Sequence, residues 1–368
     1  MSGGSVAMRL KPPRERRAGT AAWAASWLRA NLFDTWTNTL LTLLVVAAAA
    51  LILPPLWRWG VAHATLSGTT RAACRGGGAC WTFIRVRLPL FFYGHYPAAA
   101  RWRVDLSFVL LAVFAAPVLR TRTRRRGLAV LLLVTLFPAL AAVLLAGGVF
   151  GLMPVETNAW GGLMLDVVIA FVTVAGSLPL GVLLALGRRS HLPVVRALAI
   201  GFIELWRGVP LLTVLFMSAV MVPLFLPQGV SLDRLVRALV ALILFNAAYM
   251  AEVVRGGLQG VPPGQQEAAF SLGLGWWRMQ ALVVLPQALR IAVPAIVNTV
   301  VDLFKDTTLV SIVGLADLLG VVSQALKDPA WLGFPTEGYV FAAAMFFVCC
   351  FAMSAYGRRI ERQLAAGR

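Results

Sequence analysis

The sequence predicts an all-α integral membrane protein with about eight transmembrane helices. Three observations lead to this fold class: 60% of the 368 residues are hydrophobic, only 13% are charged, and the mean hydropathy is +0.81. An ordinary soluble domain is roughly 45–50% apolar and about 25% charged. A water-soluble enzyme and a disordered chain are therefore excluded.

The expected spans follow from the length of the apolar stretches. A helix crosses the bilayer core, which is about 30 Å thick, with roughly 20 residues. Such stretches occur at about residues 37–57, 104–119, 127–149, 161–186, 198–222, 235–254, 285–304 and 338–357. The seventh span contains Pro294, Asn298 and Asp302, which a helix tolerates where it faces protein or a cavity.

The basic residues indicate how the chain is oriented. A formal net charge of +18 would suggest a nucleic-acid partner in a soluble protein, but here the arginines cluster beside apolar spans. Cytoplasmic segments carry such clusters, and four of them lie on one side if both termini are cytoplasmic. The first loop contradicts this orientation, because it carries Arg71, Arg75, Arg85, Arg87, Arg101 and Arg103. We expect both termini inside and no nucleic-acid partner.

A change in composition near residue 150 divides the chain. We expect a basic cytoplasmic tail at 1–36, a three-span extension with a large outer loop at 37–156, and a five-span working domain at 157–362. In that outer loop a flexible Arg-Gly-Gly-Gly-Ala spacer separates Cys74 from Cys80, so a disulfide is possible if the loop faces an oxidising compartment. No further Cys or His pair has metal-ligand spacing, so no metal site is predicted.

The most informative loop lies between the sixth and seventh spans. Glycines and prolines precede it, and they predict a short helix from about Gln265 to Leu274. Glu267 is expected near its N-terminus, where it would complement the helix dipole. The small Ala268 and Ala269 would let a partner approach closely, and Gly273 would let the chain turn away.

This loop resembles a known motif. The spacing Glu267-Ala268-Ala269, then Gly273, Val283 and Leu285-Pro286 is similar to the EAA loop of bacterial ABC importer permeases, with Val283 in place of the usual isoleucine. The resemblance implies that the loop at 255–290 forms a coupling helix, which docks in a groove of an ATP-binding subunit. An ordinary loop helix that only caps the bundle is the simpler alternative.

Three further stretches, 204–216, 246–258 and 298–318, resemble permeases for polar amino acids, most closely the general L-amino acid permease group. The resemblance implies a transporter subunit, not an enzyme, in the bacterial inner membrane. Its partners would be an ABC ATP-binding subunit dimer, a second homologous permease subunit and a periplasmic amino-acid-binding protein. No phosphate-binding loop motif occurs in this chain, and no cofactor or catalytic residue is predicted.

The candidate substrate site lies at the end of the seventh span. Lys305 and Asp306 supply both charges that an amino acid needs as partners, and hydroxyl and amide groups add hydrogen bonds. The candidate residues are Lys305, Asp306, Thr307, Thr308, Asn246 and Asn298. A structural ion pair at the helix end is the alternative for Lys305 and Asp306.

Other charged residues in the working domain have simpler expected roles. Glu252 and Arg255 are expected to form a local pair, since they lie one helical turn apart. Asp166 is expected to extend to the outer interface without a role. Arg207, Gly208 and Pro210 resemble a kink and inner gate, or simply start a helix.

Two other classes of protein remain as alternatives. A secondary transporter or channel would require acidic residues in two corresponding halves, and no such repeat is found. A membrane-anchored scaffold would leave the spacing of the coupling loop unexplained. The sequence does not indicate which amino acids are carried.

Overall fold

The computed structural model describes residues 20–74, 76–120 and 125–366, and this part of the chain is helical apart from short turns and the two-residue strand β1 (Ala316–Asp317). The chain forms two units. Unit 1 comprises residues 1–65 and 74–79, and unit 2 comprises residues 66–73 and 80–368. The prediction of an all-α membrane protein is confirmed.

Unit 1 holds the first predicted span. Helix α1 (Thr20–Leu32) precedes helix α2 (Trp36–Trp57), which continues as a π-helical turn, Arg58–Ala62. The Thr35 hydroxyl accepts a hydrogen bond from the Asn38 amide at 3.2 Å and so caps the start of α2. The basic residues before Thr20 lie outside the described part of the chain.

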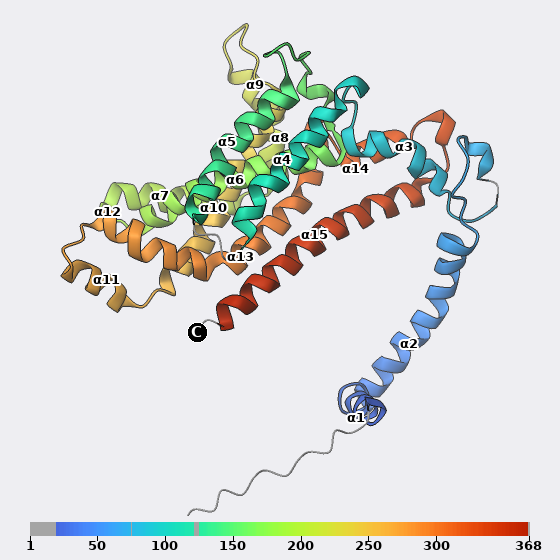
Figure 1. Ribbon diagram of the computed structural model, residues 1–368, viewed down its shortest axis with the longest axis horizontal. Coiled ribbons are helices and arrows are strands. Elements are labelled where there is room, and N and C mark those ends of the chain that lie inside the picture. Colours follow the sequence, from blue (N-terminus) through green and yellow to red (C-terminus); the bar gives the residue numbers. More distant parts are fainter. Residues whose placement is uncertain (1–19, 75, 121–124, 367–368) are drawn as a thin grey trace, which may run out of the picture. The chain divides into compact units, whose positions relative to one another are not determined.

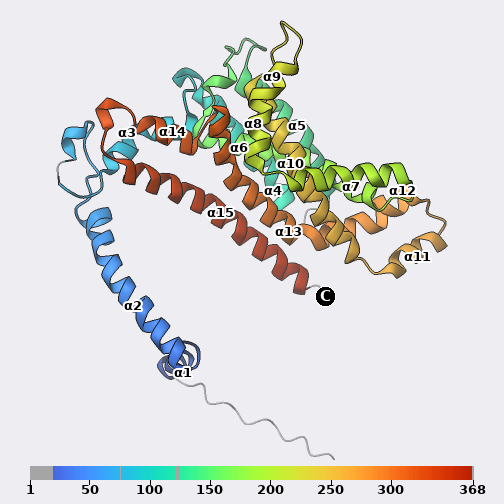
Figure 2. The ribbon, with the colours of Figure 1, turned by 180° about the vertical axis from the view of Figure 1, so that it is seen from behind.

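Unit 2 holds the other spans and the loops between them (Figures 1 and 2). Its helices are α3 (Trp81–Tyr93), α4 (Arg101–Leu119), α5 (Arg126–Ala146), α6 (Gly162–Arg188), α7 (Pro193–Gly208), α8 (Leu211–Phe216), α9 (Val222–Phe225), α10 (Arg234–Gln259), α11 (Pro263–Ser271), α12 (Trp276–Met279), α13 (Leu285–Asp306), α14 (Leu318–Ala325) and α15 (Pro335–Ala366).

Seven helices in the described chain are long and apolar enough to span a membrane, and a bent pair makes an eighth. The bent pair corrects the prediction of one continuous span at 198–222, because α7 and the segment 211–225 meet at 99°. The bend has a local cause. Val209 is extended, as expected before a proline, and Pro210 has no amide hydrogen to continue the helix. The predicted kink at Arg207–Pro210 is therefore present.

Helices α6 and α10 form the centre of unit 2, because small residues let them approach closely. A Cβ atom on Gly181 of α6 would lie 2.6 Å from the Met250 Cβ of α10. A Cβ atom on Gly257, near the end of α10, would lie 2.4 Å from the Ala288 carbonyl oxygen of α13. Contacts of this kind replace the hydrophobic effect as the force that holds membrane helices together. Helices α13 and α15 pack beside this centre (Figures 1 and 2).

Helix α3 is an element that the span prediction missed, because its 13 residues are too few to cross a bilayer. It contacts other elements of unit 2 through aromatic rings. Phe83 lies 5.6 Å from Trp331, and Phe91 lies 5.2 Å from Phe341, between ring centroids. Aromatic rings at such distances pack favourably. The predicted large loop is thus partly helical, and its helix α3 packs on other elements of unit 2.

Several arginines that opposed the predicted orientation are engaged by groups of unit 2. Arg87 pairs with Asp328, Arg85 donates to the Gly68 carbonyl at 2.9 Å, and the buried Arg103 donates to the Met153 carbonyl at 2.8 Å. The Arg101 guanidinium lies 5.4 Å from the centre of the Tyr93 ring. These arginines therefore help to pack α3 and α4 within unit 2.

Candidate functional site

The predicted coupling helix exists as α11, between the spans α10 and α13. Its boundaries, Pro263–Ser271, are close to the expected Gln265–Leu274. Pro263 occupies the first turn, where its fixed φ suits a helix start. Gly273 has φ +74°, so the chain turns away there, as expected. In Figure 1, α11 lies at one end of unit 2, and α9 lies at the other.

Two details of this helix differ from the prediction. Glu267 lies beyond the first turn of α11, so it does not complement the helix dipole as expected. Ala269 is buried against the chain's own core, together with Met279, Val284 and Ala288. Glu267 and Ala268 remain exposed.

Two large apolar residues beside Ala269 face outward. Phe270 is 56% exposed and Leu272 is 81% exposed. The spacing of the small residues in the sequence does not reveal these two side chains, since their orientation depends on which face of α11 packs inward. Exposed apolar side chains on a short helix outside the bundle are typical of an interface.

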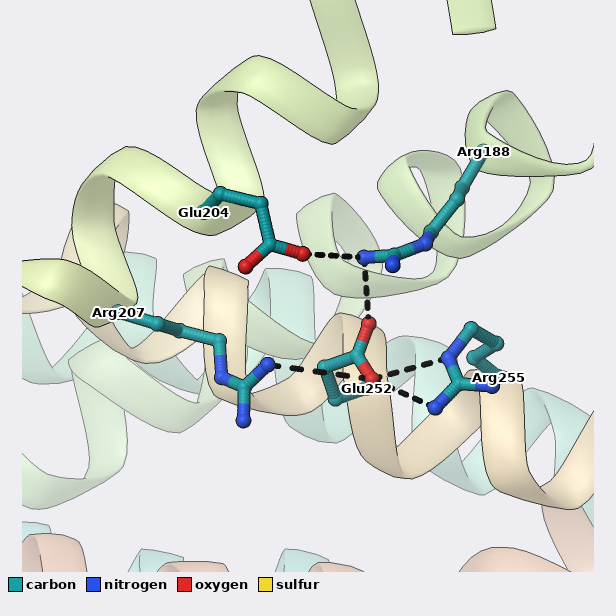
Figure 3. Close-up of polar contacts among 5 residues, drawn as sticks. All are labelled: Arg188, Glu204, Arg207, Glu252 and Arg255. Carbon is teal, nitrogen blue, oxygen red and sulfur yellow. Dashed lines mark hydrogen bonds and ion pairs between the residues drawn. The ribbon is translucent and has the colours of Figure 1, made fainter.

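A charge cluster joins three helices at the same end of unit 2. Figure 3 shows Arg188, Arg207 and Arg255 pointing toward Glu252. Arg255 donates twice to Glu252 Oε2, at 2.7 and 2.9 Å, which confirms the expected local pair. Arg188 donates to Glu252 Oε1 at 2.9 Å and to Glu204 at 3.0 Å, and Arg207 lies 3.9 Å from Glu252 Oε2. One carboxylate thus links α6, α7 and α10.

A polar stripe runs along the C-terminal half of α13. Asn298, Asp302 and Lys305 are exposed, and their spacing of four and three residues places them on one face of the helix. The Lys305 ammonium pairs with Asp302 at 2.8 Å, and the two side chains are 56% and 68% exposed. A membrane-spanning helix does not present such groups to lipid, because desolvating a charge costs several kcal/mol. This face therefore belongs to a protein partner or a water-filled path.

The remaining candidate residues divide into two groups. Asp306 is half-buried, and the Thr308 hydroxyl donates to the Lys305 carbonyl at 2.9 Å. Asn246 and Thr307 instead point into the chain's own packing. The Asn246 amide donates to the Leu242 carbonyl of its own helix at 2.9 Å, and Thr307 is fully buried.

Asp166 holds Thr307 in place, which the sequence reasoning missed. The Thr307 hydroxyl donates to Asp166 Oδ1 at 2.6 Å, and the Leu318 amide donates to Oδ2 at 3.0 Å. The expectation that Asp166 extends to the outer interface was wrong: it is fully buried, and it ties α6 to the ends of α13 and α14. A carboxylate inside an apolar span rarely faces lipid, and this rule is the signal that could have found it.

Asp317 lies next to this contact and begins α14. It accepts hydrogen bonds from the amides of Leu319 and Gly320, at 3.1 and 3.0 Å. Burial nevertheless raises the pKa of Asp317 to about 6, because desolvation outweighs the amide donors. Strand β1 pairs with Gly161 and Gly162 in parallel, so the start of α6 is anchored here too.

No group of three metal-ligating side chains occurs among the described residues. Cys349 and Cys350 are free thiols within α15. The pairing of Cys74 with Cys80 stays a prediction.

A bundle of apolar spans, one of them broken, with an exposed helix between two spans and a polar face on another, is the architecture of a membrane transport subunit. A family model of the binding-protein-dependent transport system inner membrane component matches residues 177–366. The chain belongs to this family. It is a multi-pass permease subunit of the inner membrane and not itself an enzyme, as predicted.

The relatives cover more of the chain than the family model does. The chain is 51% identical over 357 residues to the inner membrane amino-acid ABC transporter permease protein YhdY of Escherichia coli, with 97% of each covered. It is 36% identical to the glutamate/glutamine/aspartate/asparagine transport system permease protein BztC of Rhodobacter capsulatus, with 93% of this chain and 94% of that protein covered. A solved structure, described as an amino acid ABC transporter with histidines, is 31% identical, covers 55% of this chain and 92% of that chain, and has a TM-score of 0.49.

Proposed function

We propose that this permease subunit carries L-amino acids across the inner membrane along the polar face of α13. The observation that carries the proposal is the exposure of Asn298, Asp302 and Lys305 within an apolar span. The amino-acid names of the two long relatives agree with such a substrate class. A second, homologous permease subunit would face this stripe and complete the path.

The chemistry of the stripe suits a free amino acid. Its α-carboxylate needs a cationic partner, which Lys305 supplies, and its α-ammonium needs an anion or acceptor, which Asp302, Asp306 and Asn298 supply. The Lys305 ammonium and the Asp302 carboxylate pair with each other at 2.8 Å. A zwitterion can replace this pairing by inserting between the two groups, so that neither charge is left without a partner.

The energy for transport would come from a partner ATP-binding subunit that docks on α11. Glu267, Phe270 and Leu272 form its exposed surface, and Ala269 anchors the helix to the permease. Force applied to α11 would reach α13 through Ala269, which packs against Val284 and Ala288. A periplasmic amino-acid-binding protein would deliver substrate at the opposite end.

The substrate proposal is tested by amino acid uptake in proteoliposomes that contain the full importer. Lys305→Gln and Asp306→Asn should each lower uptake at least tenfold and leave assembly with the partner subunits intact, because loss of one charge-assisted hydrogen bond costs about 1.5–3 kcal/mol. Thr299→Val, on the flank of the stripe, is the control. Loss of assembly in both variants would favour a structural ion pair instead. Competition with acidic, basic and neutral amino acids would then define the substrate range.

The same proteoliposomes discriminate the ATP-driven importer from a secondary transporter. Uptake should require ATP together with the binding protein, and it should persist when ionophores remove all ion gradients. Uptake that follows an ion gradient without ATP would contradict the proposed energy source.

A further inference from the structure

An apolar cavity lies between helices α4 and α5 of the predicted extension and helices α6 and α10 of the transport domain. It has a volume of about 270 Å³. No charged side chain is among the described residues that line it, and its polar groups are limited to Ser107, Thr157 and the indole nitrogen of Trp160. All four helices are long and apolar enough to span a membrane, so the cavity lies within the apolar layer.

The cavity runs along one half of these spans. One end lies beside Val104, Leu145 and Leu235, next to the start of α4, the end of α5 and the start of α10. The other end lies at Phe137 and Phe171, whose ring centroids are 4.9 Å apart. Between the start of α6 and Phe171 the helix rises about 14 Å, at about 1.5 Å per residue. This rise is close to half of the bilayer core of about 30 Å, which is the depth of one leaflet.

The cavity reaches the lipid-facing surface of the bundle between α5 and α10, because Ala142 and Val236 line it and are exposed. Its apolar walls offer water too few hydrogen-bond partners. A void of this size would also cost the lining side chains their packing contacts. At this depth the molecules that surround the spans are lipid acyl chains. An acyl chain is therefore the occupant that matches both the walls and the position.

Trp160 adds a polar group to the end of the cavity that lies near the helix termini. It precedes α6 and is 7% exposed, and its indole nitrogen has no hydrogen-bond partner among the described residues. A buried indole N–H ordinarily has an acceptor. Tryptophan side chains in membrane proteins concentrate at the headgroup level, next to the ester groups of the lipids. An ester carbonyl is thus a suitable acceptor at this depth.

We propose that this cavity binds one acyl chain of a glycerophospholipid from the leaflet beside Trp160. The chain extends from Trp160 toward Phe137 and Phe171, and its ester carbonyl accepts a hydrogen bond from the Trp160 indole. Because the lining residues carry no charge, the site selects the chain and its ester and not a particular headgroup. The bound chain fills the space between the α4–α5 pair and α6, and so joins the predicted extension to the transport domain.

Photolabelling of the full importer in phosphatidylcholine vesicles tests the site. The probe is a phosphatidylcholine with a diazirine in one acyl chain, and mass spectrometry locates the adducts. Met164 lines the cavity but is only 1% exposed, so lipid around the bundle does not reach it. Val109 of α4 is 57% exposed and lies outside the cavity, so it reports the surrounding lipid. Both residues should be labelled in the unmodified importer.

Two substitutions on α5 form a matched pair. Ala141→Phe places a ring in the cavity and should lower the labelling of Met164 about fivefold or more. Ala139→Phe, at an exposed position outside the cavity, should change it less than about twofold. The labelling of Val109 should stay the same in both variants. Absence of labelling at Met164 in the unmodified importer, or an equal loss in both variants, would overturn the site.

An ether-linked version of the same probe tests the contact with Trp160. It lacks the ester carbonyl, so it should label Met164 about threefold less than the ester probe does, as expected for the loss of one neutral hydrogen bond. Trp160→Phe keeps an aromatic ring but removes the N–H, so in this variant the two probes should label Met164 equally. Equal labelling by the two probes in the unmodified importer would contradict the ester contact, and so would a difference between them that persists in Trp160→Phe.

Discussion

At the scale of single residues, the buried Asp166 carboxylate joins α6 to the C-terminal end of α13 and the start of α14. Its two oxygens satisfy the Thr307 hydroxyl and the Leu318 amide, which belong to segments about 140 and 150 residues away. A buried donor without a partner costs about 1–3 kcal/mol. Asp166 therefore holds the C-terminal end of α13, the helix that carries Lys305, in position. Asp166 itself is not part of the polar stripe.

Replacing Asp166 by Ala should lower the free energy of unfolding by about 1–3 kcal/mol, because the buried Leu318 amide loses its acceptor and the Thr307 hydroxyl keeps only the Phe304 carbonyl. Thr307→Ser keeps the hydroxyl and should cost less than Thr307→Val, which removes it. Thermal unfolding in detergent measures all three variants. If Asp166→Ala and Thr307→Ser were equally stable, the carboxylate would not have the structural role assigned to it.

Asp317 should make stability depend on pH. Its pKa in the folded chain is about 6, above its usual value of 3.8, so the folded state holds the proton more tightly than the unfolded state does. The resulting stabilisation is complete below about pH 4 and is lost as the pH rises through 6. Asp317→Asn retains a good helix cap, so it should remove this slope without loss of α14. Melting temperatures between pH 4 and 7 provide the measurement, and parallel profiles for both proteins would contradict it.

At the scale of helices, the contact between α6 and α10 depends on the absence of a side chain at Gly181. Gly181→Ala would place a Cβ atom 2.6 Å from the Met250 Cβ and should destabilise the protein by about 1–3 kcal/mol. Gly201 lies in α7 with open space around it, so Gly201→Ala should be neutral or slightly stabilising. Equal melting temperatures for the two variants would show that α6 and α10 can separate without cost.

The exposed surface of α11 should control association with the ATP-binding subunit. Glu267→Arg and Leu272→Ala should each reduce copurification of that subunit and ATPase stimulation by substrate, because they change exposed residues and leave the inward-facing Ala269 in place. Glu361→Arg, a charge reversal at an exposed site of α15, is the control. Unchanged ATPase coupling in both α11 variants would rule out α11 as the coupling helix.

At the scale of the whole molecule, periodicity and hydropathy were sufficient to predict the fold class and most spans. Apolar length identifies α2, α4, α5, α6, α10, α13 and α15, and the Glu267–Pro286 spacing identifies the family. The 99° bend in the fifth span was not predicted as such, since hydropathy averages over Val209 and Pro210. Helix α3 was missed because it does not cross the bilayer.

The candidate site could be predicted only in part, because the direction of a side chain depends on how the helices pack. Sequence identifies polar residues within a span, but it does not indicate the direction in which each one points. Lys305 and Asn298 face outward, whereas Thr307 and Asn246 face other helices of the same chain. Partners distant in sequence, such as Asp166 for Thr307 and Arg188 for Glu252, follow only from the packed helices.

The Glu252 cluster restricts how the bundle can rock during a transport cycle. Separating α6, α7 and α10 at this point would break the contacts of Arg188 with Glu252 and Glu204 and leave Glu252 paired only with Arg255 of its own helix, so we expect the three helix ends to move together. The helices must then move relative to one another at a different point. We expect the extended link Val209–Pro210, between α7 and the segment 211–225, to be this hinge. When the path opens and closes, the segment 211–225 would accordingly rotate about Val209–Pro210, while the contacts of the Glu252 cluster stay in place.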